Sequence, residues 1–233
     1  MKSKSNFVLI IGATEDLSYK IARQLAINGY NLILVAQNID ELEEKSNRLK
    51  KIGAEVIAIT KNLLRQEEVY SLYSELKLNG ISPEILINNT GRELYGKLKN
   101  MDVHREIDIV NLNIISTMLL NDLFLKERMQ EGSGKILNII HAAHTSDPGY
   151  WIFHGVQCFI LSWCHAFKDK LAHTGITLFT HVEEAADTDN TDNTDNTDEE
   201  SIIHALLKIN ASKERNSFPD QNTKNSAEYR TVL

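Results

Sequence analysis

The 233-residue sequence predicts a single α/β domain built on a doubly wound parallel sheet of the Rossmann type. Two observations lead to this fold class. Residues 7–11 form a continuous apolar run that Gly12 ends, and a helical pattern follows directly, as expected for a buried strand, a tight turn and a helix. Apolar runs and helical patterns then alternate as far as residue 182, which favours crossover connections with helices on both faces.

Turn residues set the limits of the predicted elements. Asn28-Gly29 ends the first helix, Gly53 ends the second, and Pro83 precedes the fourth strand. Strands are expected at residues 7–11, 30–36, 54–60, 84–89, 135–140 and 175–182. Helices are expected at residues 18–26, 39–52, 66–78, 103–130 and 151–172, and the last two are apolar over most of their surface.

The net charge of −7 is concentrated in one segment. Residues 183–200 hold nine acidic side chains and no Lys or Arg, so the rest of the chain carries about +2. No basic stripe with interleaved aromatic residues occurs, which argues against nucleic-acid binding. Cys158 and Cys164 share one predicted helix, six residues apart, which suits a reducing compartment. We expect a soluble cytoplasmic protein with no membrane or nucleic-acid partner.

The chain divides into three predicted parts. Residues 1–186 are expected to form the Rossmann-like domain. Residues 187–200 contain an acidic Thr-Asp-Asn repeat without apolar side chains, which predicts a disordered linker. Residues 201–233 are expected to complete a short helix and end in a polar tail. That helix, at 199–209, should dock on the domain through its apolar side chains, Ile202, Ile203, Leu206 and Leu207.

Several segments, in the correct order, resemble the short-chain dehydrogenase/reductase family over residues 6–188. The family's TGxxxGxG turn corresponds to residues 11–18, and its NNAG motif corresponds to residues 88–91. The family has four catalytic residues: an asparagine, a serine, a tyrosine and a lysine. By the resemblance, their positions are taken here, in the same order, by Asn111, His141, Phe153 and Gln157. The resemblance implies a Rossmann fold, a nicotinamide dinucleotide and the oxidoreduction of a carbonyl or alcohol.

The residues at these catalytic positions differ in chemistry from those of the family. The resemblance implies a tyrosine that transfers a proton, a lysine that lowers the pKa of that tyrosine and a serine that orients the substrate oxygen. Phe153 has no hydroxyl group, Gln157 carries no charge, and His141 is larger than serine. Only Asn111 keeps the family's residue, so we expect the proton relay to be lost.

The cofactor positions are altered as well. By the resemblance they are Gly12, Thr14, Asp16, Leu17, Gln37, Asn62, Asn89 and Gly91. Asp16 and Ser18 replace two glycines that let the backbone approach a pyrophosphate. A carboxylate at Glu15 or Asp16 that lay about 4 Å from a phosphate charge would repel it by about 4 kcal/mol at an effective dielectric constant of about 20. Glu183 and Glu184 add negative charge, so we expect no cofactor or only weak NAD(P) binding.

Some of these residues also have a simpler structural interpretation. Gly12 would be needed for the tight turn even if it contacted no nucleotide. Asn88 and Asn89 would satisfy backbone groups at the end of a strand, a role that needs no ligand. His141, His144 and Glu183 allow a metal site, but their spacing closes no four-ligand set and we predict no metal.

The sequence thus leads to two functional hypotheses. The first is a catalytically impaired homologue, a pseudoenzyme that serves as a binding or assembly subunit in a homo-oligomer or with an active paralogue. Its candidate interface residues, with core packing as the alternative, are Phe159, Ile160, Trp163 and Phe167. The second is an NAD(P)-dependent oxidoreductase that acts on a carbonyl or alcohol with His141 or water as a rearranged proton donor.

Overall fold

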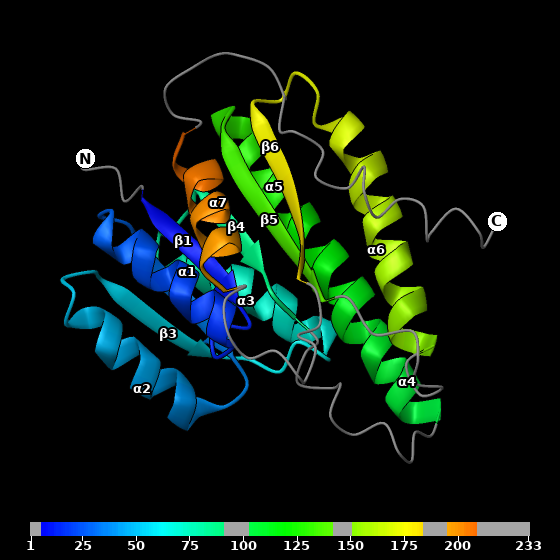
Figure 1. Ribbon diagram of the computed structural model, residues 1–233, viewed down its shortest axis with the longest axis horizontal. Helices are drawn as coiled ribbons and strands as arrows, with labels where there is room; N and C mark the ends of the chain where they lie inside the picture. Colours follow the sequence, from blue (N-terminus) through cyan, green and yellow to red (C-terminus); the bar gives the residue numbers. More distant parts are fainter. Residues whose placement is uncertain (1–5, 91–102, 142–150, 184–194, 209–233) are drawn as a thin grey trace.

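A computed structural model describes residues 6–90, 103–141, 151–183 and 195–208. Six parallel strands form one sheet in the order β3-β2-β1-β4-β5-β6 (Figure 1). The chain starts in the middle of the sheet, builds outward to β3, and then returns past β1 to β4, β5 and β6. This order confirms the doubly wound Rossmann-type fold, and it places the reversal of direction between β1 and β4.

The predicted strands are all present, with ends within two residues of the expected ones. They are β1 (Phe7–Ile11), β2 (Asn31–Ala36), β3 (Val56–Thr60), β4 (Ile85–Asn88), β5 (Gly134–His141) and β6 (Ile176–Glu183). The helices are α1 (Asp16–Ile27), α2 (Ile39–Lys50), α3 (Gln66–Leu78), α4 (Val103–Val110), η2 (Asn111–Ser116), α5 (Thr117–Glu131), α6 (Trp151–Lys170) and α7 (Asp195–Lys208).

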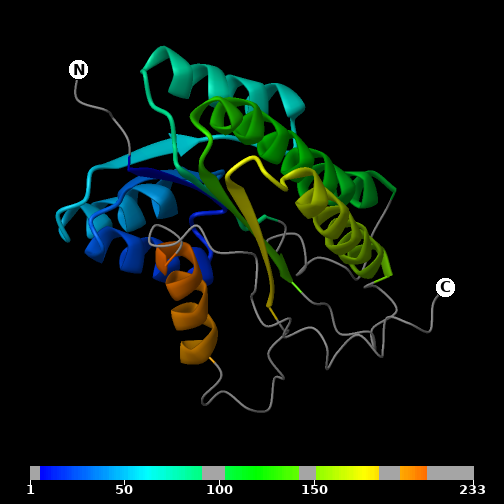
Figure 2. The ribbon, with the colours of Figure 1, turned by 90° about the horizontal axis from the view of Figure 1, so that it is seen from above.

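Helices cover both faces of the sheet, as Figure 2 shows. Leu9 and Ile11 of β1 pack with α3, α5 and α6, whereas Val8 and Ile10 pack with α1, α2 and α7. All four side chains have no exposed surface. Because successive residues of a strand point to opposite faces, a strand covered on both faces must be apolar throughout, and this explains the unbroken run in the sequence.

The long helix predicted at residues 103–130 is interrupted by a π-helical segment, η2. The hydroxyl group of Ser116 donates to the carbonyl oxygen of Asn111, five residues earlier, at 3.1 Å. The same hydroxyl contacts the carbonyl oxygen of Leu63. A polar side chain that inserts into the backbone ladder favours such a widened turn, which hydropathy alone does not reveal.

Helix α7 begins earlier than predicted, at Asp195 rather than at residue 199. The prediction that the whole Thr-Asp-Asn repeat is disordered is therefore wrong for residues 195–198, whereas residues 187–194 lie outside the described residues. Ile202 and Leu206 are buried against the domain beside α1, in agreement with the expected docking.

Lys135 of β5 fastens the end of α7 to the sheet. Its ammonium group donates a hydrogen bond to the carbonyl oxygen of Leu206, one of the last carbonyl groups of that helix. Burial lowers the pKa of Lys135, and the nearby Glu84 partly opposes this effect. A lysine at a helix C-terminus complements the dipole, so this contact holds α7 in one orientation.

One segment of the described chain, Val103–Glu131, is long and apolar enough to cross a membrane by length and composition alone. Its side chains at Leu112, Leu120 and Phe124 lie in the core against the sheet. Core packing therefore accounts for part of the apolar character of this segment, whereas Val103 and Ile107 remain exposed.

The candidate interface residues of α6 separate into core and surface. Ile160 is buried in the core, and the Trp163 and Phe167 rings stack on each other with centroids 4.7 Å apart while packing against that core. For Ile160 the alternative of core packing therefore holds, because its side chain is already covered within the chain. Phe159 remains 43% exposed.

Candidate functional site

The turn between β1 and α1 is packed against the end of β4. Gly12 has a φ angle of 69°, and a Cβ atom added to it would lie 1.7 Å from the carbonyl oxygen of Asn89. The backbone N–H group of Asn89 in turn donates to the carbonyl oxygen of Ile11 at 3.1 Å. The chain itself therefore requires glycine at position 12, whether or not a ligand approaches it.

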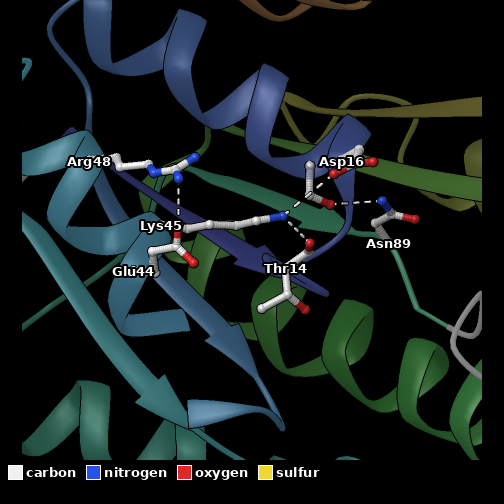
Figure 3. Close-up of polar contacts among 7 residues, drawn as sticks. Thr14, Asp16, Glu44, Lys45, Arg48 and Asn89 are labelled. Atoms are coloured by element: carbon white, nitrogen blue, oxygen red, sulfur yellow. Dashed lines mark hydrogen bonds and ion pairs between the residues drawn. The ribbon is translucent and has the colours of Figure 1, made fainter. Parts of the chain in front are cut away.

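A cation from α2 neutralises the outer side of this turn. The Lys45 ammonium group contacts the carbonyl oxygen of Thr14, lies 3.7 Å from the Asp16 carboxylate and sits 5.3 Å from the centre of the Tyr19 ring. Figure 3 shows Lys45 reaching Thr14 and Asp16 from α2. The Asp16 side chain is 93% exposed, so its carboxylate turns away from the interior. Sequence reasoning missed Lys45, because this residue lies 31 positions after Thr14 along the chain.

Four side chains form a series of close polar contacts, two hydrogen bonds and one histidine–carboxylate contact, across the carboxyl ends of the strands. The Asn89 side-chain amide donates to Ser18 Oγ at 2.7 Å, and Asn89 Oδ1 lies 2.7 Å from His141 Nε2. His141 Nδ1 lies 2.5 Å from Glu183 Oε2. We call this series, Ser18–Asn89–His141–Glu183, the polar chain. It connects α1, the end of β4, the end of β5 and the end of β6.

The polar chain fixes the hydrogen-bonding roles of His141. Because the Asn89 amide nitrogen donates to Ser18, the Asn89 oxygen accepts from His141, and Nε2 therefore carries a proton. The other ring nitrogen faces a carboxylate. The residue is 8% exposed, so both nitrogens are used inside the protein.

The other family positions are arranged around α6. Phe153 has no exposed surface and packs with Ile109 and Val156. Gln157, at the position of the family's lysine, is 4% exposed. Asn111 is the first residue of η2, and it is the neighbouring Asn113 that reaches the hollow described next.

Two hollows flank the polar chain. The first, the Gly12 hollow, has about 460 Å³ of space counted out to the open surface. The second, the Gln157 hollow, has about 350 Å³ on the same count. Residues lining the Gly12 hollow include Gly12, Thr14, Glu15, Gln37, Asn62 and Asn89. Residues lining the Gln157 hollow include Asn113, Thr117, His141, Val156, Gln157 and Ile160. Thr90 lines both.

The predicted cofactor positions are thus only partly brought together. Five of the eight line the Gly12 hollow, namely Gly12, Thr14, Gln37, Asn62 and Asn89. Asp16 points to solvent, and Leu17 packs against the apolar cluster under α1, so neither lines the hollow as predicted. Gly91, Glu184 and His144 lie outside the described residues. Within the described ranges, no group of three or more His, Cys, Asp or Glu side chains could hold a metal ion.

A six-stranded parallel sheet with a glycine turn at its switch point defines a Rossmann-type α/β protein. The family model described as short chain dehydrogenase matches residues 6–199. Since this covers most of the sequence, the chain belongs to the short-chain dehydrogenase family of oxidoreductases.

The chain is similar to ketoacyl reductase HetN of Nostoc sp., with 28% identity over 173 residues, 73% of this chain and 60% of the relative. It spans 51–60% of the length of the first three curated relatives. The fold is similar to that of the bulky-bulky ketone specific alcohol dehydrogenase from Comamonas testosteroni, with a TM-score of 0.76, 22% identity and coverage of 97% and 90%. It is also similar to a Sphingobium yanoikuyae short-chain dehydrogenase in complex with NADPH, with a TM-score of 0.75, 21% identity and coverage of 96% and 91%.

Proposed function

We propose that this chain is a catalytically impaired short-chain dehydrogenase, a pseudoenzyme that acts as a binding or assembly subunit. The observation that carries the proposal is the engagement of His141 on both sides, by Asn89 and by Glu183. This residue stands where the family places the serine that orients the substrate oxygen. A ring held in this way has no nitrogen directed at a substrate.

The neighbouring positions support the same conclusion. Phe153 is fully buried among apolar side chains and has no proton to give or take. Gln157 lacks the positive charge that lowers the pKa of a catalytic tyrosine. General acid–base catalysis contributes typically 10²–10⁴-fold, so a site without a proton donor loses that factor even with substrate in place.

The Gly12 hollow offers little positive charge to the phosphate groups of a nicotinamide dinucleotide. The Gly12 hollow offers Gln37 and Asn62 as hydrogen-bonding groups. Its lysine, Lys61, is occupied by Glu75 at 3.4 Å and Glu68 at 3.7 Å, and Glu15 adds a carboxylate to its wall. We therefore propose that NAD(P) binding is absent or weak, although a solved neighbour carries NADPH.

The proposed partner is a second copy of this chain or an active paralogue. The exposed apolar side chains of α4 and α6 provide the contact surface, and they are Val103, Ile107, Trp151 and Phe159. Helices α4 and α6 contact each other, so these exposed side chains lie on neighbouring elements that a partner could cover together. Native mass determination of a complex purified from cells tests this part, and a strictly monomeric protein would contradict it.

Titration of the purified protein with NADH and NADPH, followed by the fluorescence of Trp151 and Trp163, tests the proposal. The expected result is no saturable binding in the micromolar range and no reduction of 3-oxoacyl substrates, which are chosen because the curated relatives include a ketoacyl reductase. The competing hypothesis, an oxidoreductase with His141 or water as the proton donor, requires micromolar binding and turnover. Micromolar binding of NADH or NADPH, or turnover of a substrate, would overturn the pseudoenzyme proposal.

Restoration of the family residues provides a second test. Phe153→Tyr, Gln157→Lys and His141→Ser are combined with Asp16→Gly and Ser18→Gly, and the matched control carries only the first three changes. Reductase activity in the fivefold variant alone would show that both the proton relay and the cofactor turn are impaired in the natural chain. Equal activity in the control would locate the loss in the relay alone.

A further inference from the structure

One hydrogen bond joins the lining of the Gly12 hollow to the lining of the Gln157 hollow. Asn89 lines the Gly12 hollow, His141 lines the Gln157 hollow, and the two side chains are joined at 2.7 Å. Thr90 lines both hollows, so they meet at this point. A ligand that extends from one hollow into the other has to pass the Asn89–His141 bond.

The polar chain holds this boundary firmly. Ser18 and Asn89 are at most 1% exposed, and His141 is 8% exposed. The backbone of Asn89 is held as well, because its N–H group donates to the carbonyl oxygen of Ile11 at 3.1 Å. At the other end, the Glu183 carboxylate binds the far side of the imidazole at 2.5 Å. Asn89 and His141 are therefore restrained from opposite sides.

We propose that His141 determines which ligands can bind across the groove that the Gly12 hollow and the Gln157 hollow form together. It closes the passage between the hollows, so that a dinucleotide is excluded at its nicotinamide end while the adenosine end alone can still enter the Gly12 hollow. The inference rests on the proposed function, because it supplies a cause for the weak dinucleotide binding proposed above. Passage of a dinucleotide requires the Asn89–His141 bond to break, and the resulting penalty falls on the full-length ligand only.

The test compares the binding of a complete dinucleotide, NADH, with the binding of its adenosine half, AMP. NADH and AMP are titrated against the natural protein and His141→Ser by isothermal calorimetry. Loss of the bond is expected to increase NADH affinity by roughly 10- to 100-fold, while AMP affinity stays within about 2-fold. His154→Ser is the matched control, because His154 contacts Cys158 Sγ at 3.7 Å and lines neither hollow. This control should leave both affinities unchanged.

Two milder variants keep the test decisive if His141→Ser does not fold. Glu183→Gln preserves size but weakens the hold on the imidazole, and Ser18→Ala removes the acceptor of the Asn89 amide. Each should raise NADH affinity by a smaller factor without changing AMP affinity, and circular dichroism checks the fold.

The outcomes separate the two proposals. Weak NADH binding in the natural protein that stays weak in every folded variant would overturn the role of His141 and leave the pseudoenzyme proposal standing. An equal increase in the affinities for NADH and for AMP would also overturn the role of His141, because the substitution would then have changed the whole groove and not the passage between the hollows. Micromolar NADH binding by the natural protein would overturn both proposals.

Discussion

Asn88 and Asn89 are adjacent at the end of β4, yet they belong to two buried networks of different character. Asn88 donates to Asn138 at 2.7 Å and to Asn121 at 3.0 Å, and Asn138 donates to Cys164 Sγ at 3.3 Å. Every member of this amide cluster is neutral and at most 2% exposed. The polar chain of Asn89 instead ends at Glu183, whose side chain is 25% exposed.

The difference shows how one strand end can serve both stability and ligand access. Burial raises the pKa of Cys164, so its thiol stays protonated and the amide cluster holds no charge. Neutral groups joined by hydrogen bonds rigidify the junction of β4, β5 and α6. The polar chain instead ends in a carboxylate, Glu183, beside the two hollows. By our proposal, a change in the partners of His141 alters which ligands the hollows admit.

Gly12→Ala should give the largest effect, because the turn supports the polar chain. The added methyl group meets the carbonyl oxygen of Asn89 at 1.7 Å, and the φ angle of 69° adds backbone strain. We expect a loss of at least about 3 kcal/mol in the free energy of unfolding, measured by urea denaturation. Gly29→Ala is the control, since it has a φ angle of 83° but open space, and it should lose about 1–2 kcal/mol. Equal losses would refute the contact with Asn89.

Asn138→Leu breaks the amide cluster alone. Asn88 and Asn121 each lose a hydrogen-bond partner in the core, so the free energy of unfolding should fall by about 2–4 kcal/mol. Asn113→Ala, which removes only a bond to Ile109 within one helix, should cost less than about 1 kcal/mol. A stability change in Asn138→Leu smaller than in this control would contradict the assignment of the cluster to stability.

Glu183→Gln weakens the polar chain at its charged end. Because Glu183 is partly exposed, we expect a loss of about 1 kcal/mol, with a coupling energy of similar size in a double-mutant cycle with His141→Asn. The exposed pair Glu44–Arg48, also 2.5 Å apart, is the control, and Glu44→Gln should cost about 0–0.5 kcal/mol. A coupling energy near zero would mean that His141 and Glu183 act independently.

The smallest effect concerns Lys135 and pH. Burial lowers its pKa below the ordinary value of 10.5, so the folded protein releases this proton at a lower pH than the unfolded chain does. The unfolded state then binds more protons, and stability contributed by Lys135 rises as pH increases through that interval towards 10.5. Lys135→Met should flatten this rise in urea denaturation curves recorded up to about pH 10. An unchanged slope would show that Lys135 does not titrate differently in the folded state.

Much of the fold was predictable, because it depends on short-range patterns. The run at 7–11 is apolar at every position, and Gly12 and Pro83 mark the ends of their elements. The widened turn at η2 was missed, since it depends on how the Ser116 hydroxyl meets Asn111 and Leu63.

The site was predictable as a set of positions but not as a set of contacts. The resemblance located His141, Phe153 and Gln157, yet the partners of His141 are 52 and 42 residues away along the chain. Ser18 and Asn89 are separated by 71 residues. No local periodicity relates such residues, because only the order of the strands brings them together.

The segment η2 has a consequence for the history of this helix. A π-type turn closes hydrogen bonds over five residues instead of four, so it accommodates one residue more than the same length of α-helix. Removal of a single amino acid within Asn111–Ser116 would therefore restore ordinary winding without unfolding the flanking turns. That makes this stretch the point in the long helix where we expect the deletion of one residue to disturb the winding least.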